Sequence, residues 1–309
     1  MASDPLRTVA AAACAAVVAG CSMQPHEKRT VEFPKAVSLG ELYAVERVAT
    51  WVRGPTRLKR GLAKGTVTVK IPEGSYLELQ VHRSVSDLSA LFALPPDALE
   101  SISLDTLQLS DRDLKSLTRL TGLERLSLGA TGVRGTGLEH LAKLPELEVL
   151  SLALCPLEDV DLRGLEGLRS LRTLNLTRTP ITDDAINRVV RLPNLESLSL
   201  NGTAVSDRGM RTLARETSLK RLDVGNTKLT DDGLRHLGGM TGLTELTLDG
   251  MRITDAGLRH LQPLTRLRHL RLSNTRVTEA GIKLLASHMD PCGIESNQID
   301  KKRVFPECF

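Results

Sequence analysis

A leucine recurs at a fixed spacing of 24 residues through most of this 309-residue chain. The recurring positions are Leu99, Leu123, Leu147, Leu171, Leu195, Leu219, Leu243 and Leu267, with no insertion or deletion between them. A fixed period of this length is typical of solenoids, in which each repeat forms one coil and stacks on its neighbours. Because a single coil cannot bury its apolar face alone, the sequence predicts a continuous stack of coils.

The repeats share the pattern LxxLxLxxTxxTDxGLxxLxxLxx, whose positions we number from 1 at the first leucine. Leucines at positions 4 and 6 have the period of two that is typical of a strand. The Thr-Asp pair at positions 12 and 13 supplies a capping hydroxyl and a carboxylate for a helix N-terminus. Apolar residues at positions 16, 19 and 22 would then form one face of a short helix. Each coil is therefore predicted to contain a strand, a turn and a short helix.

This pattern resembles the leucine-rich-repeat family, in the variant with a T-D-x-G-L segment that is common among bacterial members. The resemblance covers residues 99–290 as eight repeats of 24 residues. It implies an α/β solenoid, a horseshoe with a concave parallel β-sheet and short convex helices. At a strand spacing of about 4.8 Å, eight coils would give a sheet roughly 38 Å long. Position 9 points inward in this family, so Cys155, which replaces the usual Thr there, is expected to be a buried packing residue.

The first residues do not fit the repeat. Residues 8–20 are an uncharged apolar run, shorter than the roughly 20 residues that a membrane-spanning helix needs. The run is typical of a secretory signal peptide, which we assign to residues 1–20. It ends in Val18-Ala19-Gly20-Cys21, which resembles the lipobox of bacterial lipoproteins.

That resemblance implies lipid attachment to Cys21 and a lipidated tether over residues 21–35. Ser22 after the cysteine favours, by the same resemblance, the outer membrane. We therefore expect an exported protein, lipid-anchored to the bacterial cell envelope. The alternative is an ordinary secreted protein that is cleaved near Ala19 or Gly20.

The ends of a solenoid expose apolar surface and need caps. Residues 36–98 are predicted to be a β-rich N-terminal cap, with alternating strand runs at 65–71 and 75–81 around a hairpin turn at 72–74, and a further strand at 38–44. Aromatic residues make up only 2% of the chain, and all of them lie outside the repeats. Residues 291–309 are the predicted C-terminal cap. Cys292 and Cys308 could form a disulfide there in an oxidising compartment, or could be two free thiols.

The formal net charge of +4 is spread over the chain and does not form the basic patch expected of a nucleic-acid-binding protein. One segment, residues 47–70, contains basic residues and no acidic ones. Near a lipid anchor this segment could contact anionic head groups. It could equally be a solvated loop of the cap. The basic residues are Arg47, Arg53, Arg57, Lys59, Arg60, Lys64 and Lys70.

The sequence contains no G-x-S-x-G, H-E-x-x-H, phosphate-binding glycine loop or C-x-x-C motif. The strict 24-residue period is stronger evidence, because active sites usually break regular patterns, so we predict no catalytic residues, no cofactor and no enzyme. His140, His236 and His260 share position 18 and should face solvent side by side, without the convergence that a metal needs. Asp183, Asp207, Asp231 and Asp255 share position 13, where each is explained by its own helix N-terminus better than by a bound cation. An alternative places an enzyme site in the cap, with His82 and Asp87 as its acid–base candidates.

Strand positions 2, 3, 5, 7 and 8 are predicted to face the concave side, and positions 5 and 7 are mostly small and polar. Charge is graded along this face. Acidic residues prevail in the first three coils, where Glu100, Asp105, Glu124 and Glu148 stand against Arg125, and basic residues in the last coil, at Arg268, His269 and Arg271. Such a gradient could orient a partner, or it could be an incidental feature of a solvated face. Our candidate partner-binding residues are Arg125, Asn175, Asp223, Glu245, His269 and Arg271.

These observations predict a recognition module that is anchored to the cell envelope and binds a protein, a peptide or a glycan through the concave face of the repeats. A structural envelope spacer without a specific partner is the alternative. Repeats 1–3 depart most from the shared pattern, with Leu107 at position 9, Arg134-Gly135 at positions 12 and 13, and Cys155-Pro156 in the turn. Irregular coils are where a specific epitope is best sought.

Overall fold

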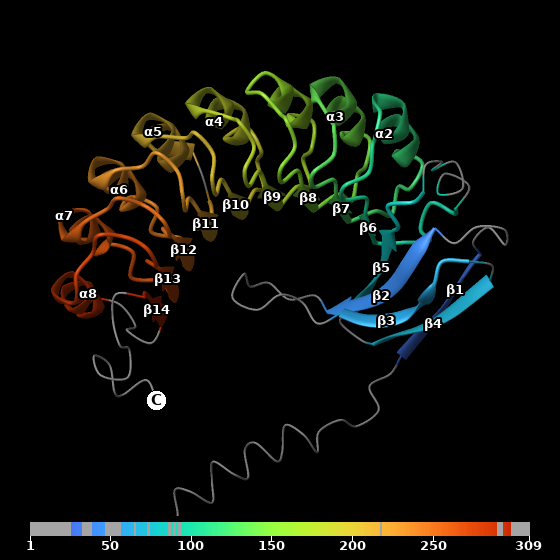
Figure 1. Ribbon diagram of the computed structural model, residues 1–309, viewed down its shortest axis with the longest axis horizontal. Helices are drawn as coiled ribbons and strands as arrows, with labels where there is room; N and C mark the ends of the chain where they lie inside the picture. Colours follow the sequence, from blue (N-terminus) through green and yellow to red (C-terminus); the bar gives the residue numbers. More distant parts are fainter. Residues whose placement is uncertain are drawn as a thin grey trace, which may run out of the picture. The chain divides into compact units, whose positions relative to one another are not determined.

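The computed structural model describes residues 26–32, 39–46, 57–64, 66–72, 75–85, 88, 91, 94–216, 218–288 and 293–297 (Figure 1). The chain divides into two compact units, Met1–Glu78 and Leu79–Phe309. The predicted signal peptide, Cys21 and the candidate disulfide of Cys292 with Cys308 lie outside the described residues.

The first unit is built of antiparallel strand pairs. Strand β1 (His26–Glu32) pairs with β4 (Thr66–Pro72) along its whole length. Strand β2 (Gly40–Glu46) pairs with β3 (Arg57–Leu62), with a register shift between Leu42 and Tyr43. The β-rich character and the predicted strand near 38–44 are thus present. Strand β1, however, lies inside the range that we expected to be a polar tether.

The predicted hairpin of the runs at 65–71 and 75–81 is wrong. Both runs are strands, β4 and β5 (Ser75–Val81), but β4 is bonded to β1 and not to β5. The burial of β5 gives the physical reason. Tyr76 to Leu79 are four consecutive buried residues, so both faces of β5 are covered, whereas a strand in an exposed hairpin alternates between buried and solvated residues.

The second unit is the stack of coils. Each coil contributes a three-residue strand at positions 3 to 5, and each register pair joins residues 24 apart, as in Ser101 with Arg125. The strands are β6 (Ser101–Ser103), β7 (Arg125–Ser127), β8 (Val149–Ser151), β9 (Thr173–Asn175), β10 (Ser197–Ser199), β11 (Arg221–Asp223), β12 (Glu245–Thr247) and β13 (His269–Arg271). Strand β14 (Ile294–Glu295) continues the ladder in the same register. The predicted parallel sheet is confirmed.

A short helix follows the strand in each coil and lies on the outer side of the arc in Figure 1. The helices are α2 (Asp111–Leu117), α3 (Gly135–Leu141), the 3-10 helix η2 (Asp161–Leu165), α4 (Asp183–Val189), α5 (Asp207–Glu216), α6 (Asp231–Leu237), α7 (Asp255–Leu258) with η3 (Arg259–Leu261), and α8 (Glu279–Ala286). The predicted hydroxyl caps are present on α4 to α8. In α6, for example, Thr230 Oγ1 accepts a hydrogen bond from the backbone N–H of Asp232 at 3.3 Å.

The core of the stack consists of the recurring aliphatic side chains. Leu222 at position 4, Val224 at position 6 and Leu234 at position 16 are all at most 2% exposed, and their counterparts in the other coils are equally buried. Complete burial of such a side chain contributes about 1.5–3 kcal/mol to folding. Because strands and helices of successive coils pack side by side, each coil completes the core of the next.

Position 9 joins the turn to the strand before it. Thr179 Oγ1 donates to the carbonyl of Leu176 at 2.7 Å, and the threonines of other coils do the same. Cys155 takes this position in the third coil, is 1% exposed, and places its Sγ 3.0 Å from the Leu128 carbonyl. The prediction that Cys155 is a buried packing residue is confirmed.

Position 8 has left-handed backbone in every coil. The φ angles run from 54° to 72° at Thr106, Ala130, Leu154, Arg178, Gly202, Asn226, Gly250 and Asn274. Glycine and asparagine adopt this conformation readily, whereas leucine and threonine do so at a cost. Leu154 combines this backbone with a side chain that is 53% exposed.

Candidate functional site

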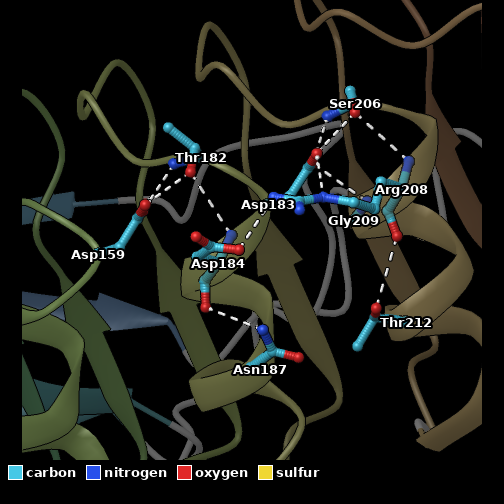
Figure 2. Close-up of polar contacts among 9 residues, drawn as sticks. All are labelled: Asp159, Thr182, Asp183, Asp184, Asn187, Ser206, Arg208, Gly209 and Thr212. Carbon is cyan, nitrogen blue, oxygen red and sulfur yellow. Dashed lines mark hydrogen bonds and ion pairs between the residues drawn. The ribbon is translucent and has the colours of Figure 1, made fainter.

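The aspartates at position 13 join each coil to the next one. Asp183 Oδ1 accepts hydrogen bonds from the backbone N–H groups of Ser206 and Gly209, at 2.7 and 3.1 Å, and its Oδ2 accepts from the Ser206 hydroxyl at 2.7 Å (Figure 2). Four further aspartates bind the backbone N–H and hydroxyl of position 12 in the following coil. These pairs are Asp159 with Thr182, Asp207 with Thr230, Asp231 with Thr254, and Asp255 with Thr278. We call this row the aspartate clamp.

Asp183, Asp207, Asp231 and Asp255 lie in the first turn of their own helices, as expected, and the clamp gives their carboxylates a second role between coils. It also explains the glycine at position 15. A Cβ built on Gly209, Gly233, Gly257 or Gly281 would lie 2.6, 2.2, 2.3 or 2.1 Å from the Oδ1 atom of the preceding clamp aspartate. The T-D-x-G segment is therefore a motif of two coils, because the glycine of one makes room for the carboxylate of the other.

The second and third coils are joined in the opposite direction. Helix α3 begins at Gly135 after Arg134, which has no capping hydroxyl. Asp161, from the third coil, accepts a hydrogen bond from Gly135 N at 3.0 Å and another from Glu158 N at 2.8 Å. The irregular Arg134-Gly135 pair thus has a structural explanation. Asp161 supplies the carboxylate that the second coil lacks.

The clamp favours the ionised carboxylate. Burial by itself would raise the pKa of Asp183, but the backbone and hydroxyl bonds from Ser206, with those from Arg208 and Gly209, hold that pKa below its usual value. Both oxygens of each clamp aspartate accept protein hydrogen bonds, so the contact between coils accounts for the carboxylate without a bound cation. Among the described residues, no group of three or more His, Cys, Asp or Glu side chains could hold a metal ion.

Side chains on the strand face are bonded to one another across coils. Asn175 Oδ1 accepts from Thr177 N at 3.0 Å, and Asp223 Oδ1 accepts from Gly225 N at the same distance. Between them lies Ser199, which is 1% exposed and has hydrogen-bonding contacts with Thr177 and Asp223. The two predicted residues Asn175 and Asp223 thus belong to one network across β9, β10 and β11.

Asp223 is electrostatically the opposite of the clamp. Burial raises its pKa, and the nearby carboxylate of Asp249 raises it further. Hydrogen bonds from Gly225, Asn201 and Ser199 act against this rise without cancelling it. The strand face therefore contains an aspartate whose charge is unfavourable, where Asn175 occupies the equivalent place in the fourth coil.

Position 2 forms a row of alternating ion pairs. Arg172 lies between two glutamates, 3.4 Å from Glu148 and 2.8 Å from Glu196, and Lys220 lies 2.9 Å from Glu196. The Lys220 bond is the main cause of the lowered pKa of Glu196. Each of these cations is thus bound by a carboxylate that lies 24 residues away in sequence, on a neighbouring coil.

The other predicted binding residues differ in how they are engaged. Arg125 on β7 and Glu245 on β12 are half-buried. Arg271 on β13 is exposed but forms an ion pair with Asp249 at 2.9 Å and lies 4.0 Å from Glu295. Arg271 is therefore already neutralised within the protein. His269 is half-buried, and no ion pair joins it to another described residue.

A pocket of about 910 Å³ lies beside His269 and was not anticipated. Its lining residues come from the start and the end of the seventh coil, from positions 1 to 3 of the eighth coil, and from the residue just before β14. They are Thr244, Thr265, Arg266, Leu267, Arg268, His269 and Gly293. The signal available in the sequence was Thr244, which replaces the charged residue found at position 2 in all other coils.

Other predicted residues do not form a site in the described part of the chain. His140, His236 and His260 are half-buried on separate helices. His82 is exposed, and its proposed partner Asp87 lies outside the described residues. In the basic segment, Lys59 forms an ion pair with Glu41, and residues 47–56 lie outside the described residues. Within the described residues, no helix combines the length and the apolar character needed to cross a membrane.

Comparison with known proteins agrees with this architecture. A sequence model of the family described as "Leucine Rich repeat" matches residues 167–186, 191–214 and 216–238. No curated protein matches the sequence. Among solved structures, an internalin from Listeria monocytogenes is similar at 24% identity, with 75% of this chain and 70% of that chain covered and a TM-score of 0.50.

An internalin C2 from the same species is also 24% identical, with 61% of this chain and 84% of that chain covered and a TM-score of 0.46. At this identity the likeness concerns the fold alone. The repeat pattern, the parallel ladder, the outer helices and the matched family model lead to one conclusion: the chain contains leucine-rich repeats and folds as a leucine-rich-repeat solenoid.

Proposed function

We propose that this protein is a recognition module that binds a protein or peptide through the strand face of its repeats. The main support is a division of labour between positions of the repeat. Positions 4 and 6 are aliphatic in every coil and form the core. Position 3 of the same strands instead varies freely, and reads Ser, Arg, Val, Thr, Ser, Arg, Glu and His from β6 to β13. Chemical variety on a constant scaffold is what a recognition surface requires.

The fixed geometry of the face also supports this proposal. Its polar side chains are bonded across neighbouring strands, as in the contacts of Asn201 with Asp223 and of Thr177 with Ser199. A side chain that is already ordered loses less entropy when a partner binds, so more of the contact energy is available as affinity. The sparse aromatic content means that Arg, Glu and His would provide the strongest contacts.

The proposal includes export and a lipid anchor at Cys21. The apolar run before Cys21 and the lipobox-like end of that run support it. Two or more acyl chains would give a durable anchor, since each buried methylene contributes about 0.8 kcal/mol. We expect the full-length protein to incorporate radioactive palmitate and to fractionate with envelope membranes. The Cys21→Ser variant should do neither, and equal labelling of the two proteins would overturn the anchor.

Site-specific photo-crosslinking tests the binding face. A photoreactive amino acid is placed at Thr173 or Arg221, both half-buried on the strand face, and at Glu139 or Arg259, both exposed on the outer helices. We expect one saturable adduct, identified by mass spectrometry, from the strand-face positions and not from the helix positions. Competition by unmodified protein should abolish it. Adducts of equal yield from both sets, or none from any position, would contradict recognition by this face and favour a structural spacer.

A further inference from the structure

The pocket at the last coils has a distinct electrostatic character. Among its lining residues are Arg266 and Arg268, both exposed, together with the half-buried His269 and the hydroxyl-bearing Thr244 and Thr265. Among the lining residues that the structure describes there is no carboxylate, and no ion pair joins the two arginines to another described residue. The pocket is therefore a concave, open site that is dominated by positive charge.

The row of ion pairs at position 2 shows what the pocket lacks. Arg172 and Lys220 are each bound by a glutamate one coil away. Arg268 occupies the same position in the last coil, but its neighbour in the preceding coil is Thr244. The hydroxyl of Thr244 is directed elsewhere, since it donates to the carbonyl of Lys220 at 3.0 Å. The alternation of acidic and basic residues along position 2 thus ends at Lys220, and Thr244 stands where an acid would pair with Arg268.

Arg266 is in a similar situation. It lies at position 24, and the corresponding residue of the preceding coil is Gly242, which has no side chain to offer. The nearest acidic residue in the strand register is Glu245, which is paired in register with His269. Neither Arg266 nor Arg268 forms an ion pair with another described residue, and guanidinium groups bind carboxylates through paired hydrogen bonds.

The backbone around the pocket is closely packed and is able to present these side chains. The backbone N–H groups of Arg268 and His269 both donate to the Thr244 carbonyl, at 2.8 and 3.1 Å. On the other side, a Cβ on Gly293 would lie only 1.6 Å from the Arg268 carbonyl oxygen, so the chain approaches here as closely as glycine permits. The segment that carries the two arginines is therefore fixed from both sides.

We propose that this pocket binds an acidic side chain of an extended peptide segment of the partner, with Arg268 and Arg266 taking the carboxylate. The inference rests on the proposed function and names the chemistry of the partner. A peptide carboxylate is favoured over other anions because carboxylates from neighbouring strands already bind the equivalent cations of this row. The volume of about 910 Å³ is large enough for a side chain with its flanking backbone.

The test uses the full chain and a fluorescein-labelled hexaglutamate peptide, followed by anisotropy, with hexaglutamine as the neutral control. We expect saturable binding of hexaglutamate only, weakened by salt. Arg268→Ala should reduce the affinity about tenfold, whereas Arg235→Ala, on the outer helix α6, should leave it unchanged. Equal binding of the neutral peptide, or unchanged affinity in Arg268→Ala, would overturn the proposal.

A second pair of variants tests the effect of adding a carboxylate at Thr244, with a neutral side chain as the control. Thr244→Glu restores the alternation and should pair with Arg268, so hexaglutamate binding should fall at least as far as in Arg268→Ala while the urea midpoint of unfolding does not fall. Thr244→Gln, of the same size, should keep most of the binding. If Thr244→Glu binds the peptide as well as Thr244→Gln does, the pocket is not the carboxylate site.

Two further outcomes separate this inference from neighbouring ideas. Inorganic phosphate or a sulphated polysaccharide could compete at concentrations far below those at which free glutamate competes. That result would overturn the acidic peptide as the ligand and favour a phosphate- or sulphate-bearing one. Strand-face crosslinks that persist in Arg268→Ala, with hexaglutamate binding absent in the wild type, would retain the recognition face and refute the pocket. If the strand-face crosslinks are lost while hexaglutamate binding is retained, the pocket stands and the recognition face is refuted.

Discussion

Aspartates occur in two regions of the solenoid, and the two regions treat the same carboxylate in opposite ways. In the aspartate clamp, Asp183 accepts several hydrogen bonds from the next coil and its pKa is lowered. On the strand face, burial and the Asp249 carboxylate raise the pKa of Asp223. The clamp recurs from coil to coil, whereas Asp223 is the only aspartate at position 5 of its row.

The difference teaches how to read a repeat protein. A polar residue that recurs at one position is explained by the contact between coils, which recurs too. A polar residue that occurs once, and whose charge costs stability, is not explained by the stack. Such residues are the better candidates for function, because functional sites are where a chain departs from its most stable arrangement.

The largest expected effect tests whether the glycine belongs to the clamp. Gly233→Ala places a Cβ against Asp207 Oδ1, and we expect a loss of about 3 kcal/mol in the free energy of unfolding from overpacking and disturbed charged hydrogen bonds. Gly242→Ala is the control, since its Cβ would meet nothing nearer than the Leu219 carbonyl at 3.6 Å. Urea denaturation measures both. Because alanine favours helices over glycine, a gain in stability at Gly233 would refute the clamp geometry.

Removal of a clamp carboxylate should have the next largest effect. Asp231→Ala leaves the Thr254 backbone N–H and hydroxyl without their acceptor, and we expect a loss of about 2 kcal/mol. Asp232→Ala, the adjacent residue, loses only an exposed ion pair with Arg235 and should change stability by less than about 0.5 kcal/mol. Thermal or urea unfolding of the two variants side by side gives the comparison. Equal losses would mean that the clamp has no special role.

Acid unfolding should distinguish the two regions by sign. Since the folded pKa of Asp183 is lowered, the stability that it contributes is present above its unfolded pKa and is lost as pH falls through its folded pKa. Asp223 has a raised folded pKa, so its contribution is present below the unfolded pKa and is lost as pH rises through the folded one.

Urea midpoints measured from about pH 6 down to about pH 3 provide the test. Asp183→Asn should lose less stability over this range than the wild type, and Asp223→Asn should lose more. The Asn175 side chain, which accepts the equivalent backbone hydrogen bond, shows that asparagine fits at position 5. Changes of the same sign in both variants would remove the contrast between the regions.

The smallest effect concerns the left-handed residue of the third coil. Leu154→Asn should stabilise the protein by about 0.5–1 kcal/mol, because asparagine adopts a φ of 61° at a lower energetic cost than leucine. The control is Leu284→Asn, a leucine of similar exposure on helix α8, where asparagine should give no gain. A melting curve for each variant is sufficient. If Leu154→Asn also weakens strand-face crosslinking, the exposed leucine belongs to the recognition surface.

The fold was predictable from the sequence because the repeat period fixes the register. Once Leu99, Leu123 and their counterparts are aligned, every strand pair follows from a shift of 24 residues. The same alignment placed Cys155 at position 9, which the resemblance to leucine-rich repeats implied to point inward. The pairing of β1 with β4 was not predictable, since the polar run of β1 also fits a tether, and nothing in it names a partner some forty residues later.

The candidate site was only partly predictable, and the reason is again geometric. A pattern within one repeat cannot tell whether Asp183 serves its own helix or the next one, because both are close to position 13. The pairing of Arg271 with Asp249 joins different positions of two coils, so alignment by position conceals it. The pocket required Thr244 and Arg268 to be read together, as a break in an alternation that became visible only with the ion pairs.

From the third coil onward, every clamp points from one coil to its successor, whereas Asp161 points backward. Each coil after this reversal therefore offers the same carboxylate to its successor and the same backbone N–H and hydroxyl donors to its predecessor. Deleting residues 219–242 would bring Asp207 to Thr254 with the bonding partners unchanged in kind. The solenoid can thus be shortened or lengthened by whole coils, and each coil moves the pocket by about 4.8 Å along the sheet. The length of the strand face is therefore adjustable without redesign of either end.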